Sequence, residues 1–374
     1  MRRSSELESL ADIRVIGVGG GGSNAVDRMI DRGIRGVDFI AMNTDAQALL
    51  RSQATTRIRL GESATRGLGS GGDPEIGENA AAESIDHIYE MVKGADMIFV
   101  TAGMGGGTGT GAAPIIAREA RKEGALTIGV VTKPFFFEGS RRMAVALKGI
   151  DNLRGEVDTL IVIPNDRILE LTNKQMTLAD SFCLADDFLR QGIQGISELI
   201  TVPGIINLDF ADVKTIMAEG GAALMGVGEA EGKNRSQLAA ERAITSNLLD
   251  LTIHGAKGIL FNISGGPDLS LHEVYEAAGI VREMAHTDVN LIFGAVIDDN
   301  MVNKIRVTVV ATGFENYEPR QRMIENIEVK KKAPLATNGK TPAFPEKTSI
   351  GQNVWARPDF AHDDLAIPAF LRRR

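Results

Sequence analysis

The sequence predicts an α/β fold with a mostly parallel, doubly wound sheet, followed by a smaller region of α+β type. Helical stretches alternate with apolar, strand-like runs near 13–18, 37–42, 55–59, 96–102, 125–132 and 158–163. This alternation is typical of a parallel sheet with helices on both faces. Two glycine-rich loops each lie between one of these strands and a helix. Because ligands of such sheets bind at the carboxyl ends of the strands, we expect the functional site at that edge.

A long amphipathic helix follows the predicted sheet. Between Gln175 and Ile200, apolar residues recur at steps of three and four, at Leu178, Phe182, Ala185, Leu189, Ile193, Ile196 and Ile200. At about 1.5 Å per residue, such a helix is long enough to bridge two domains. Pro203 and Gly204 end it, and helices then alternate with strands near 221–228, 257–264, 289–297 and 304–313.

The composition agrees with a cytoplasmic protein that has ordinary hydrophobic cores. Hydrophobic residues make up 43% of the chain, and its formal net charge is -8. This acidic balance argues against nucleic acid as the main partner, because phosphate backbones bind basic surfaces. No apolar run approaches the roughly 20 residues of a membrane span, and the N-terminus lacks the apolar core of a signal peptide. The single cysteine, Cys183, excludes an internal disulfide, and we expect it to be a buried packing residue without a metal-ligand cluster around it.

The most informative stretch is a glycine-rich loop, Gly103 to Gly111, in which six of nine residues are glycine. A strand leads into it, and a helix opens at about Gly109 to Ala113. Without Cβ atoms the backbone can approach an anion closely, and the helix N-terminus adds the positive end of its dipole. The loop therefore predicts a phosphate cradle, although the lysine of an ordinary P-loop is absent. A flexible linker, the alternative, does not fit a segment between a strand and the amphipathic helix Ala112 to Lys122.

A second glycine loop, Gly17 to Gly22, lies upstream, before a predicted helix from Asn24 to Asp31. It matches G-x-G-x-x-G, which alone is a weak indication of a dinucleotide site. In such a site an acidic residue ends the next strand, but Asn43 occupies that place. An NAD-dependent dehydrogenase therefore remains only an alternative. Two glycine loops on successive parallel strands favour one polyphosphate held from both sides, and hence a mononucleotide.

Several motifs occur together in a characteristic order. They are Gly17 to Gly22, Asn43-Thr44-Asp45, Gly105 to Gly111, Lys133-Pro134-Phe135 with Phe137-Glu138-Gly139, Pro164 to Arg167, and Asn207 to Val213. With these motifs the chain resembles the tubulin superfamily, and the Thr110 variant of the glycine signature is similar to its bacterial branch, the FtsZ family. The resemblance extends from about Ile13 to Phe314. It implies a GTP-binding domain at 11–174, a central helix at 175–202 and a smaller activation domain at 203–316.

The resemblance also implies the bound groups: GTP or GDP, with Mg²⁺ held through the nucleotide phosphates and no dedicated protein metal site. The implied phosphate and ribose contacts come from the two glycine loops, from the end of the second strand and from a third glycine-rich turn; they are Gly19, Gly20, Gly21, Gly22, Ser23, Asn24, Asn43, Gly69, Gly71, Gly72, Gly103, Gly105, Gly106, Gly107, Thr108 and Gly109. The third turn resembles the loop that senses the γ-phosphate in this family, although an ordinary surface loop has the same composition. Asp73 replaces the asparagine common at that position, so we expect different hydrogen bonds there.

Contacts to guanine are predicted partly from chemistry. Guanine presents two parallel N–H donors, which one carboxylate can accept, whereas an amide suits its O6 and N7 acceptors. Asp186, at the margin of the apolar stripe of the long helix, and Asn165 are the candidates. Phe182, one turn earlier, either stacks on the base or packs in the core. Glu138 and Arg142 are spaced i, i+4, which usually indicates a surface ion pair, whereas the resemblance implies ribose and phosphate contacts.

Hydrolysis requires a positioned water, and the predicted nucleotide domain contains no obvious residue to hold it. Asn207, Asp209 and Asp212 lie beyond the long helix, where the next helix begins. Locally they have a structural alternative, with Asn207 as an N-cap and the two acids in the first helical turn. The resemblance implies instead that they enter the nucleotide pocket of the next subunit and complete its active site. Such a head-to-tail contact generates a filament, so catalysis would require polymerisation.

The two ends of the chain have a different character. Residues 1–10 are expected to be flexible, and a polar composition without apolar periodicity predicts a disordered linker at 317–362. The last segment, 363–374, combines apolar anchors with terminal arginines. It resembles the FtsZ tail peptide that binds membrane-tethering and regulatory proteins, although Ala366 stands where that motif often has an acidic residue.

These observations predict a GTP-dependent, self-assembling GTPase that scaffolds the bacterial division ring, located in the cytoplasm at midcell. The expected partners are other copies of the chain and division proteins bound through the tail, with no nucleic acid and only indirect membrane contact. Two alternatives stay open: the NAD-dependent dehydrogenase, and a filament protein that binds GTP without turnover.

Overall fold

The structure, a computed structural model, describes residues 11–170, 176–202, 204–206, 208–218, 220–245, 255–285, 289–299 and 301–314. These residues all belong to one compact unit, Met1–Glu325. The predicted flexible N-terminus, the linker at 317–362 and the tail peptide at 363–374 lie outside the described residues, as does Asn207.

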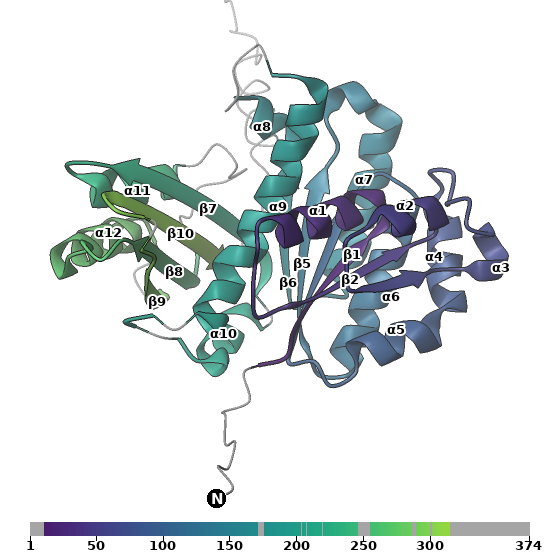
Figure 1. Ribbon diagram of the computed structural model, residues 1–374, viewed down its shortest axis with the longest axis horizontal. Coiled ribbons are helices and arrows are strands. Elements are labelled where there is room, and N and C mark those ends of the chain that lie inside the picture. The colour runs from purple at the N-terminus through teal and green to yellow at the C-terminus, as the bar shows by residue number, and fades with distance from the viewer. Residues whose placement is uncertain are drawn as a thin grey trace, which may run out of the picture. The chain divides into compact units, whose positions relative to one another are not determined.

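Ten strands of the described chain form one sheet in the order β3-β2-β1-β4-β5-β6-β7-β10-β8-β9 (Figure 1). The first six in sequence are mutually parallel: β1 (Ile13–Val18), β2 (Asp38–Asn43), β3 (Thr56–Arg59), β4 (Met97–Gly103), β5 (Leu126–Lys133) and β6 (Thr159–Pro164). Their bounds lie within a residue or so of the predicted strands, and the predicted parallel sheet is therefore confirmed.

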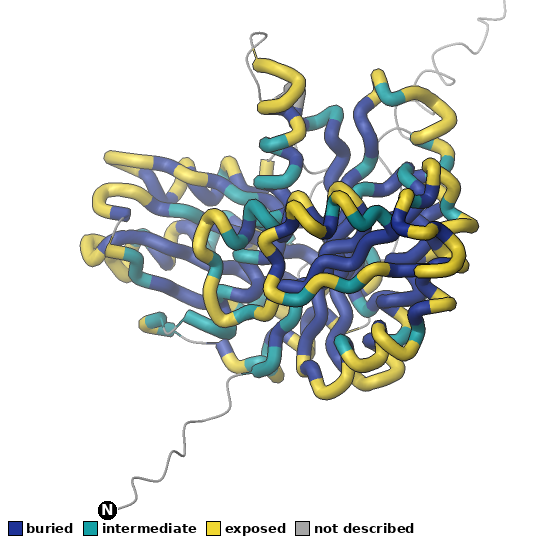
Figure 2. The backbone as a smooth tube through the Cα atoms, turned by 45° about the vertical axis from the view of Figure 1, so that its right-hand side comes forward, coloured by how far each residue is buried: buried dark blue, intermediate teal, exposed yellow. Residues whose placement is uncertain are grey.

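Helices cover both faces of this parallel sheet, as Figures 1 and 2 show. The connections contain α1 (Gly19–Asp31), α2 (Ala46–Arg51), α3 (Glu62–Thr65), α4 (Pro74–Glu83), α5 (Ile85–Val92), α6 (Thr108–Lys122), a 3₁₀ turn η1 (Phe136–Glu138), α7 (Ser140–Arg154) and α8 (Asn165–Glu170). Successive β1 residues point to opposite faces: Val15 belongs to the hydrophobic core that includes Met29 of α1, whereas Ile16 belongs to the core that includes Ile116 of α6. This alternation is the local reason for the doubly wound arrangement.

The predicted long helix is α9 (Leu178–Thr201), with 24 residues. It begins after Thr177, whose side-chain oxygen accepts a hydrogen bond from the backbone nitrogen of Asp180 at 3.1 Å. Its buried positions include Ala185, Leu189, Ile193 and Ile196, so the predicted apolar stripe does face the core.

The remaining elements are α10 (Phe210–Met217), β7 (Gly221–Glu231), α11 (Arg235–Ile244), β8 (Gly258–Gly265), α12 (Leu271–Met284), β9 (Asn290–Ile297) and β10 (Lys304–Thr312). β10 pairs antiparallel with β7 and β8, and β8 pairs parallel with β9, around a third hydrophobic core. The first residues of β7 also pair in parallel with β6, Thr159 opposite Gly221. The sheet is therefore continuous across the predicted boundary between 202 and 203, and the division into domains remains a prediction.

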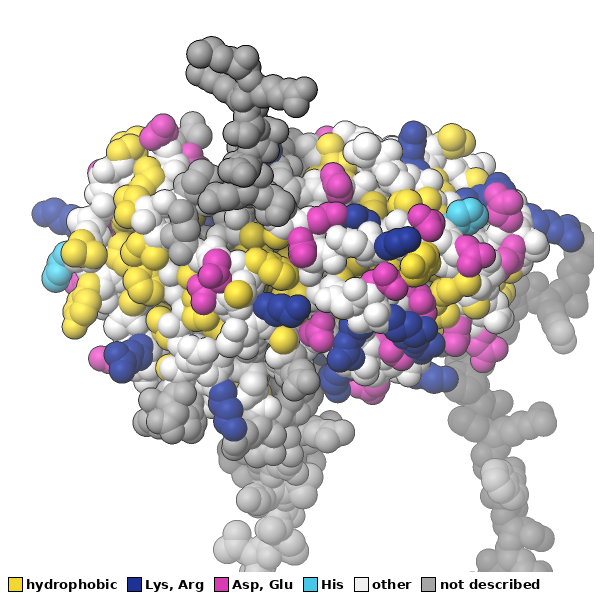
Figure 3. Space-filling model, turned by 90° about the horizontal axis from the view of Figure 1, so that it is seen from below, with side chains coloured by type: hydrophobic (Ala, Val, Ile, Leu, Met, Phe, Trp, Pro, Cys, Tyr) yellow, Lys and Arg dark blue, Asp and Glu magenta, His cyan; other side chains and the backbone are white. Residues whose placement is uncertain are grey.

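The visible surface is mixed in charge. In Figure 3, Lys and Arg side chains are interspersed with Asp and Glu, and hydrophobic side chains gather over the C-terminal part, at the left of the view. None of the helices in the described ranges is long and apolar enough to cross a membrane.

Candidate functional site

The two predicted glycine loops lie side by side at the carboxyl ends of β1 and β4, because these strands pair in parallel with Val18 opposite Ala102. A Cβ atom on Gly19 would lie 2.9 Å from the backbone nitrogen of Gly109, and one on Gly21 would lie 3.2 Å from that of Gly103. Gly19 has φ +71°, a left-handed conformation that favours glycine. α1 begins at Gly19, so the prediction that this helix starts at Asn24 was wrong: Gly19 to Gly22 form its first turn.

The two helices that follow these loops begin without side-chain caps. Val18 precedes α1, Gly107 precedes α6, and neither makes a side-chain capping hydrogen bond. The first N–H groups of an uncapped helix remain available to a ligand, and the helix dipole favours an anion there. A Cβ atom on Gly20 or Gly106 would meet no protein atom within 4 Å, so space for a ligand adjoins both loops. This geometry is that of the predicted phosphate cradle.

A chain of three buried hydroxyl groups joins the site to the third glycine turn. The Oγ1 atoms of Thr44 and Thr108 are 2.6 Å apart, and the Oγ atom of Ser70 is 3.0 Å from Thr108 Oγ1. A Cβ atom on Gly107 would lie 2.2 Å from Ser70 Oγ, so only glycine permits this close approach. The turn that was predicted to sense the γ-phosphate is therefore held against the first turn of α6.

Ser70 and Thr44, which lie beside the candidate site, were not among the predicted site residues. Their signals were a single hydroxyl side chain between Gly69 and Gly71, and a threonine within the Asn43-Thr44-Asp45 motif. Asp73, which was singled out, caps α4 by accepting a hydrogen bond from the backbone nitrogen of Glu75 at 3.0 Å.

A cavity of about 490 Å³ opens between the third turn, the β4–α6 loop and α7. It brings together most of the predicted phosphate-end residues, and its lining is Gly71, Gly72, Gly105, Gly106, Gly107, Glu138, Arg141, Arg142 and Val145. Glu138 and Arg142 do form the expected i, i+4 ion pair, at 2.9 Å, and both line the cavity. Arg141 was not predicted: with Arg142 it places two cationic side chains beside the glycine backbone.

The predicted base-binding side chains lie at the edge formed by α1, α8 and α9. Among the described residues, the buried Asn165 Oδ1 and Ser23 Oγ atoms have no hydrogen-bond partner. Buried polar atoms are nearly always paired, so two orphaned atoms at the carboxyl edge of the sheet fit a site that a polar ligand completes. Asn43 is also buried and accepts a hydrogen bond from the backbone nitrogen of Asp45, at 3.2 Å, whereas Asn24 is exposed.

Asp186 has an unusual electrostatic environment. Burial raises the pKa of its carboxyl group from 3.8 to about 7, and the positive charge of Arg28 on α1 offsets part of this rise. Phe182, one turn earlier, is 40% exposed and packs edge-on against Phe135 with ring centroids 5.3 Å apart. It is therefore not a core residue, and one part of its ring surface stays open to a ligand. Cys183 is only half-buried and accepts a hydrogen bond from Arg28 at 2.9 Å, so the expectation of a buried packing residue was wrong.

The predicted catalytic acids lie elsewhere. Asp209 is exposed and caps α10, accepting a hydrogen bond from the backbone nitrogen of Asp212 at 2.7 Å. The N-cap of α10 is therefore Asp209, whereas the local alternative had placed Asn207 there. α10 ends beside the amino end of β6, where the Thr159 hydroxyl donates to the Met217 carbonyl at 2.5 Å. Figure 1 accordingly shows α10 and α8 at opposite ends of the sheet.

Within the described ranges, no cluster of three or more His, Cys, Asp or Glu side chains is suited to hold a metal ion. The fold and the site define an α/β protein of the nucleotide-binding class. The family model for the GTPase domain of the Tubulin/FtsZ family matches residues 12–173, and that for the C-terminal domain of the FtsZ family matches residues 221–315. The chain therefore belongs to the tubulin/FtsZ family, which sets aside the NAD-dependent dehydrogenase alternative.

Solved structures agree with this assignment. An empty FtsZ dimer from M. jannaschii is 45% identical, with a TM-score of 0.78 over 81% of this chain and 88% of that one. A mutant FtsZ from M. jannaschii is also 45% identical, with a TM-score of 0.79 over 82% and 92%. CetZ2 from Haloferax volcanii, a protofilament with GTPγS, shares the fold at 23% identity, with a TM-score of 0.71 over 86% of this chain and 100% of that one.

Proposed function

We propose that this protein is a GTP-dependent, filament-forming GTPase that scaffolds the bacterial division ring, and that its active site is completed between adjacent subunits. One observation carries the proposal: the phosphate cavity and the acids predicted to serve it lie at opposite ends of the sheet in one chain. A subunit alone therefore binds the nucleotide but lacks the residues that position the attacking water.

The nucleotide in this proposal is GTP. Its phosphates lie on the amides of the β1–α1 and β4–α6 loops, and Arg142 balances part of their charge. The ionised Asp186 carboxylate accepts from guanine N1–H and N2–H₂, and the Asn165 amide donates to the base acceptors through its NH₂ group. Mg²⁺, bound through the phosphate oxygens, would neutralise the charge that develops on the β- and γ-phosphates. The protein then contributes mainly positioning and backbone electrostatics, which is where phosphoryl-transfer enzymes derive most of their rate.

The catalytic acids are those of the neighbouring subunit. Asp209 is exposed and Asp212 half-buried, and the preceding residue Ile205 is 73% exposed. At the other end of the molecule, Phe136 and Phe137 next to Glu138 are 87% and 58% exposed. Exposed apolar side chains beside both halves of the proposed site suit a contact that covers them. Because the two halves differ, the contact is head-to-tail and extends into a filament. The related structures described as a dimer and a protofilament support self-association.

The tail completes the proposed cellular role. Residues 363–374 bind membrane-tethering and regulatory division proteins at midcell, and the linker at 317–362 separates this peptide from the GTPase core. The experiment for this division of labour is removal of 363–374, after which GTP turnover and filaments should persist while recruitment to membrane-bound partners is lost. A loss of turnover in the truncated protein would contradict it.

The shared active site is tested by mixing two defective proteins. Gly106→Glu places a carboxylate in the phosphate cavity, at a position where a new side chain meets no protein atom, so it should fold but bind GTP poorly. Gly106→Gln is its neutral, matched control. Asp212→Asn keeps the pocket intact and presents a defective loop.

Each variant alone should be nearly inactive. Mixed filaments should recover hydrolysis at junctions where the unmodified Asp212 of one subunit meets the unmodified phosphate cavity of the next. Light scattering and phosphate release on a concentration series would record this, together with a threshold concentration for the unmodified protein. Turnover in a co-assembled mixture no greater than the sum of the separate proteins would contradict the shared site. Filaments of the unmodified protein without any phosphate release would favour the alternative of GTP binding without turnover.

A further inference from the structure

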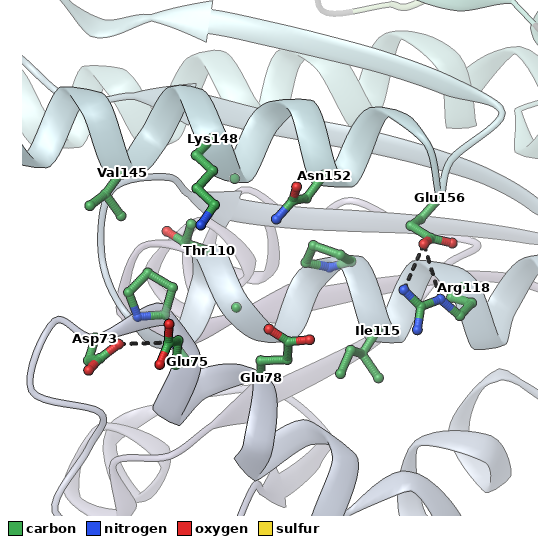
Figure 4. Close-up of a pocket in the computed structure, with 14 residues that line it drawn as sticks. Asp73, Glu75, Glu78, Thr110, Ile115, Arg118, Val145, Lys148, Asn152 and Glu156 are labelled. Atoms are coloured by element: carbon green, nitrogen blue, oxygen red, sulfur yellow. Dashed lines mark hydrogen bonds and ion pairs between the residues drawn. The ribbon is translucent and has the colours of Figure 1, made fainter.

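A second cavity lies behind the phosphate loops, between α4, α6 and α7 (Figure 4). Its volume is about 370 Å³, within the usual range of small-molecule sites. α6 forms its floor with Pro114 and Ile115, which are both buried, and the half-buried Val145 of α7 adds a third apolar surface. The cavity thus offers an apolar base to a ligand.

The two walls carry opposite charges. Lys148 and Asn152 extend into the cavity from α7, and Glu78 extends toward them from α4 (Figure 4). Glu75 of α4 also lines it. Within the described chain, neither Lys148 nor these two glutamates form an ion pair. In contrast, Arg118 and Glu156 at the far end pair with each other at 2.7 Å. Arg118 also feels the charge of Glu78. The ammonium group of Lys148 and the carboxylates of Glu75 and Glu78 therefore face one space from opposite walls without a direct ion pair among the described residues.

The walls of this cavity are the reverse side of the phosphate site. Val145 lines both cavities, and Thr110 lines the second one while its Oγ1 accepts a hydrogen bond from the backbone nitrogen of Gly105 at 2.9 Å. Asp73, which also lines the second cavity, lies against the phosphate loop: a Cβ atom on Gly107 would lie 2.7 Å from its carbonyl oxygen. A ligand that fixes α4 relative to α7 would therefore fix the loops that contact the phosphates.

We propose that this cavity binds a short apolar peptide in its zwitterionic form, such as a dipeptide, and that its occupancy is coupled to nucleotide binding. The ammonium group of the peptide faces Glu75 and Glu78, its carboxylate accepts from Lys148 and the Asn152 amide, and its side chains cover the α6 floor. A ligand with only one charge would leave one wall unpaired. The two kinds of charge come from different helices, α4 and α7, so a dipeptide, whose charged groups lie at its two ends, suits the walls better than a free amino acid, which carries both groups on one carbon.

The test uses the full-length protein with GDP and three probes: leucyl-leucine, its N-acetyl form and its C-terminal amide. Calorimetric titration should show saturable binding of the dipeptide and about tenfold weaker binding of each blocked form, because each lacks one charge-assisted contact. In Lys148→Gln the affinity for the dipeptide should fall to that for the C-terminal amide, so the protein no longer discriminates between these two probes. The N-acetyl form should still bind more weakly than the dipeptide.

Lys93→Gln is the matched control. Lys93 lies over the Tyr89 ring directly after α5 and does not line the cavity. Lys148 is an exposed residue of α7, where lysine and glutamine have similar helix propensities, so both variants should fold. No saturable binding at millimolar dipeptide, or equal binding of all three probes, would overturn the site.

Coupling has its own readout. By linkage, saturating dipeptide must change the GDP affinity by the factor by which GDP changes the dipeptide affinity. We expect this change in the unmodified protein and in Lys93→Gln, and its loss in Lys148→Gln at the same dipeptide concentration. Dipeptide binding with an unchanged GDP affinity would overturn the coupling. Because neither measurement involves hydrolysis or assembly, failure here is distinct from failure of the proposed GTPase function.

Discussion

The proposed phosphate site of this protein and the segment that begins α10 are built in different ways. At the proposed phosphate site backbone N–H groups would contact the ligand, and at Gly107 the Cβ position is already occupied by the neighbouring Ser70. At α10 the proposed chemistry lies in two carboxylates, the exposed Asp209 and the half-buried Asp212, and Asp209 also caps the helix. In the first region the same backbone atoms would serve both the fold and nucleotide binding, whereas in the second region the proposed catalytic groups could be changed without disturbing the fold. Substitutions should therefore have different consequences in the two regions.

The largest expected effect is that of Gly107→Ala. The added methyl group would lie 2.2 Å from Ser70 Oγ and 2.7 Å from the Asp73 carbonyl oxygen, so the loop must move. Overpacking of this kind costs about 1–3 kcal/mol in the free energy of unfolding, and displacement of the loop should abolish GTP binding. Thermal unfolding and nucleotide titration would measure both. The matched control is Gly106→Ala, where the methyl group meets no atom within 4 Å, and it should leave the melting temperature nearly unchanged. Equal effects at the two positions would show that the close contact of Gly107 with Ser70 does not make this position special.

Asp212→Asn should have a large effect on turnover alone. Loss of a residue that positions or activates water costs about 10²–10⁴-fold in kcat. The capping hydrogen bond of α10 uses the backbone nitrogen of residue 212 and survives the substitution, so the melting temperature and GTP affinity should not change. Phosphate release together with GTP titration checks this. A variant that hydrolyses GTP normally would leave the Asp209–Asp212 pair with only its role at the helix start.

Asp186 lies at the proposed base-binding edge, and the effect of replacing it should depend on pH. The raised pKa means that the empty protein favours the protonated carboxyl group, so its stability should fall as pH rises from about 3.8 to about 7. Guanine requires the carboxylate, so GTP affinity should rise over the upper part of that window and level off above it. Asp186→Asn should flatten both profiles and weaken GTP binding about tenfold to a hundredfold.

Nucleotide titrations and thermal unfolding between pH 5.5 and 8.5, roughly the range in which Asp186 titrates, would record both profiles. Asp187→Asn is a nearby control, because Asp187 bonds to Arg190 and Gln191 on its own helix. A GTP affinity that keeps its pH dependence in Asp186→Asn would place the titrating group elsewhere.

The smallest expected effect is that of Ser70→Ala. This change removes one hydrogen bond of the hydroxyl chain, at 3.0 Å, and leaves the glycine backbone in place. One such bond contributes about 0.5–1.5 kcal/mol, so GTP affinity should fall by no more than about tenfold. A double-mutant cycle with Thr44→Val tests whether the chain acts as a unit, since coupling should appear as non-additivity. Additive effects would show that the two bonds to Thr108 act independently.

Much of this molecule follows from local sequence patterns. The sequence predicted the order of strands and helices, the apolar stripe on α9 and the two glycine loops, with errors at the ends of elements. These features could be predicted because hydrophobic periodicity and glycine content are local properties of the sequence. The errors have local reasons as well. α1 was expected to begin at Asn24, yet Gly19 to Gly22 form its first turn against the backbone of β4 and α6. The cap of α10 was misplaced because Asn207 and Asp209 are both good capping residues in sequence.

The tertiary structure decided what depends on residues far apart in the chain. Thr44, Ser70 and Thr108 form one hydroxyl chain only because three loops, separated by up to 64 positions, meet at the carboxyl edge of the sheet. The raised pKa of Asp186 arises from burial between helices, and the cavity under Lys148 arises from three helices packed around one space; no single segment encodes either. The sequence by itself determined which segments form strands, helices and anion-binding loops, since these depend on residues a few positions apart. The distances between residues of different segments, and the burial of their side chains and charges, were decided only by the tertiary structure. They depend on how the segments pack together, which sequence spacing does not specify.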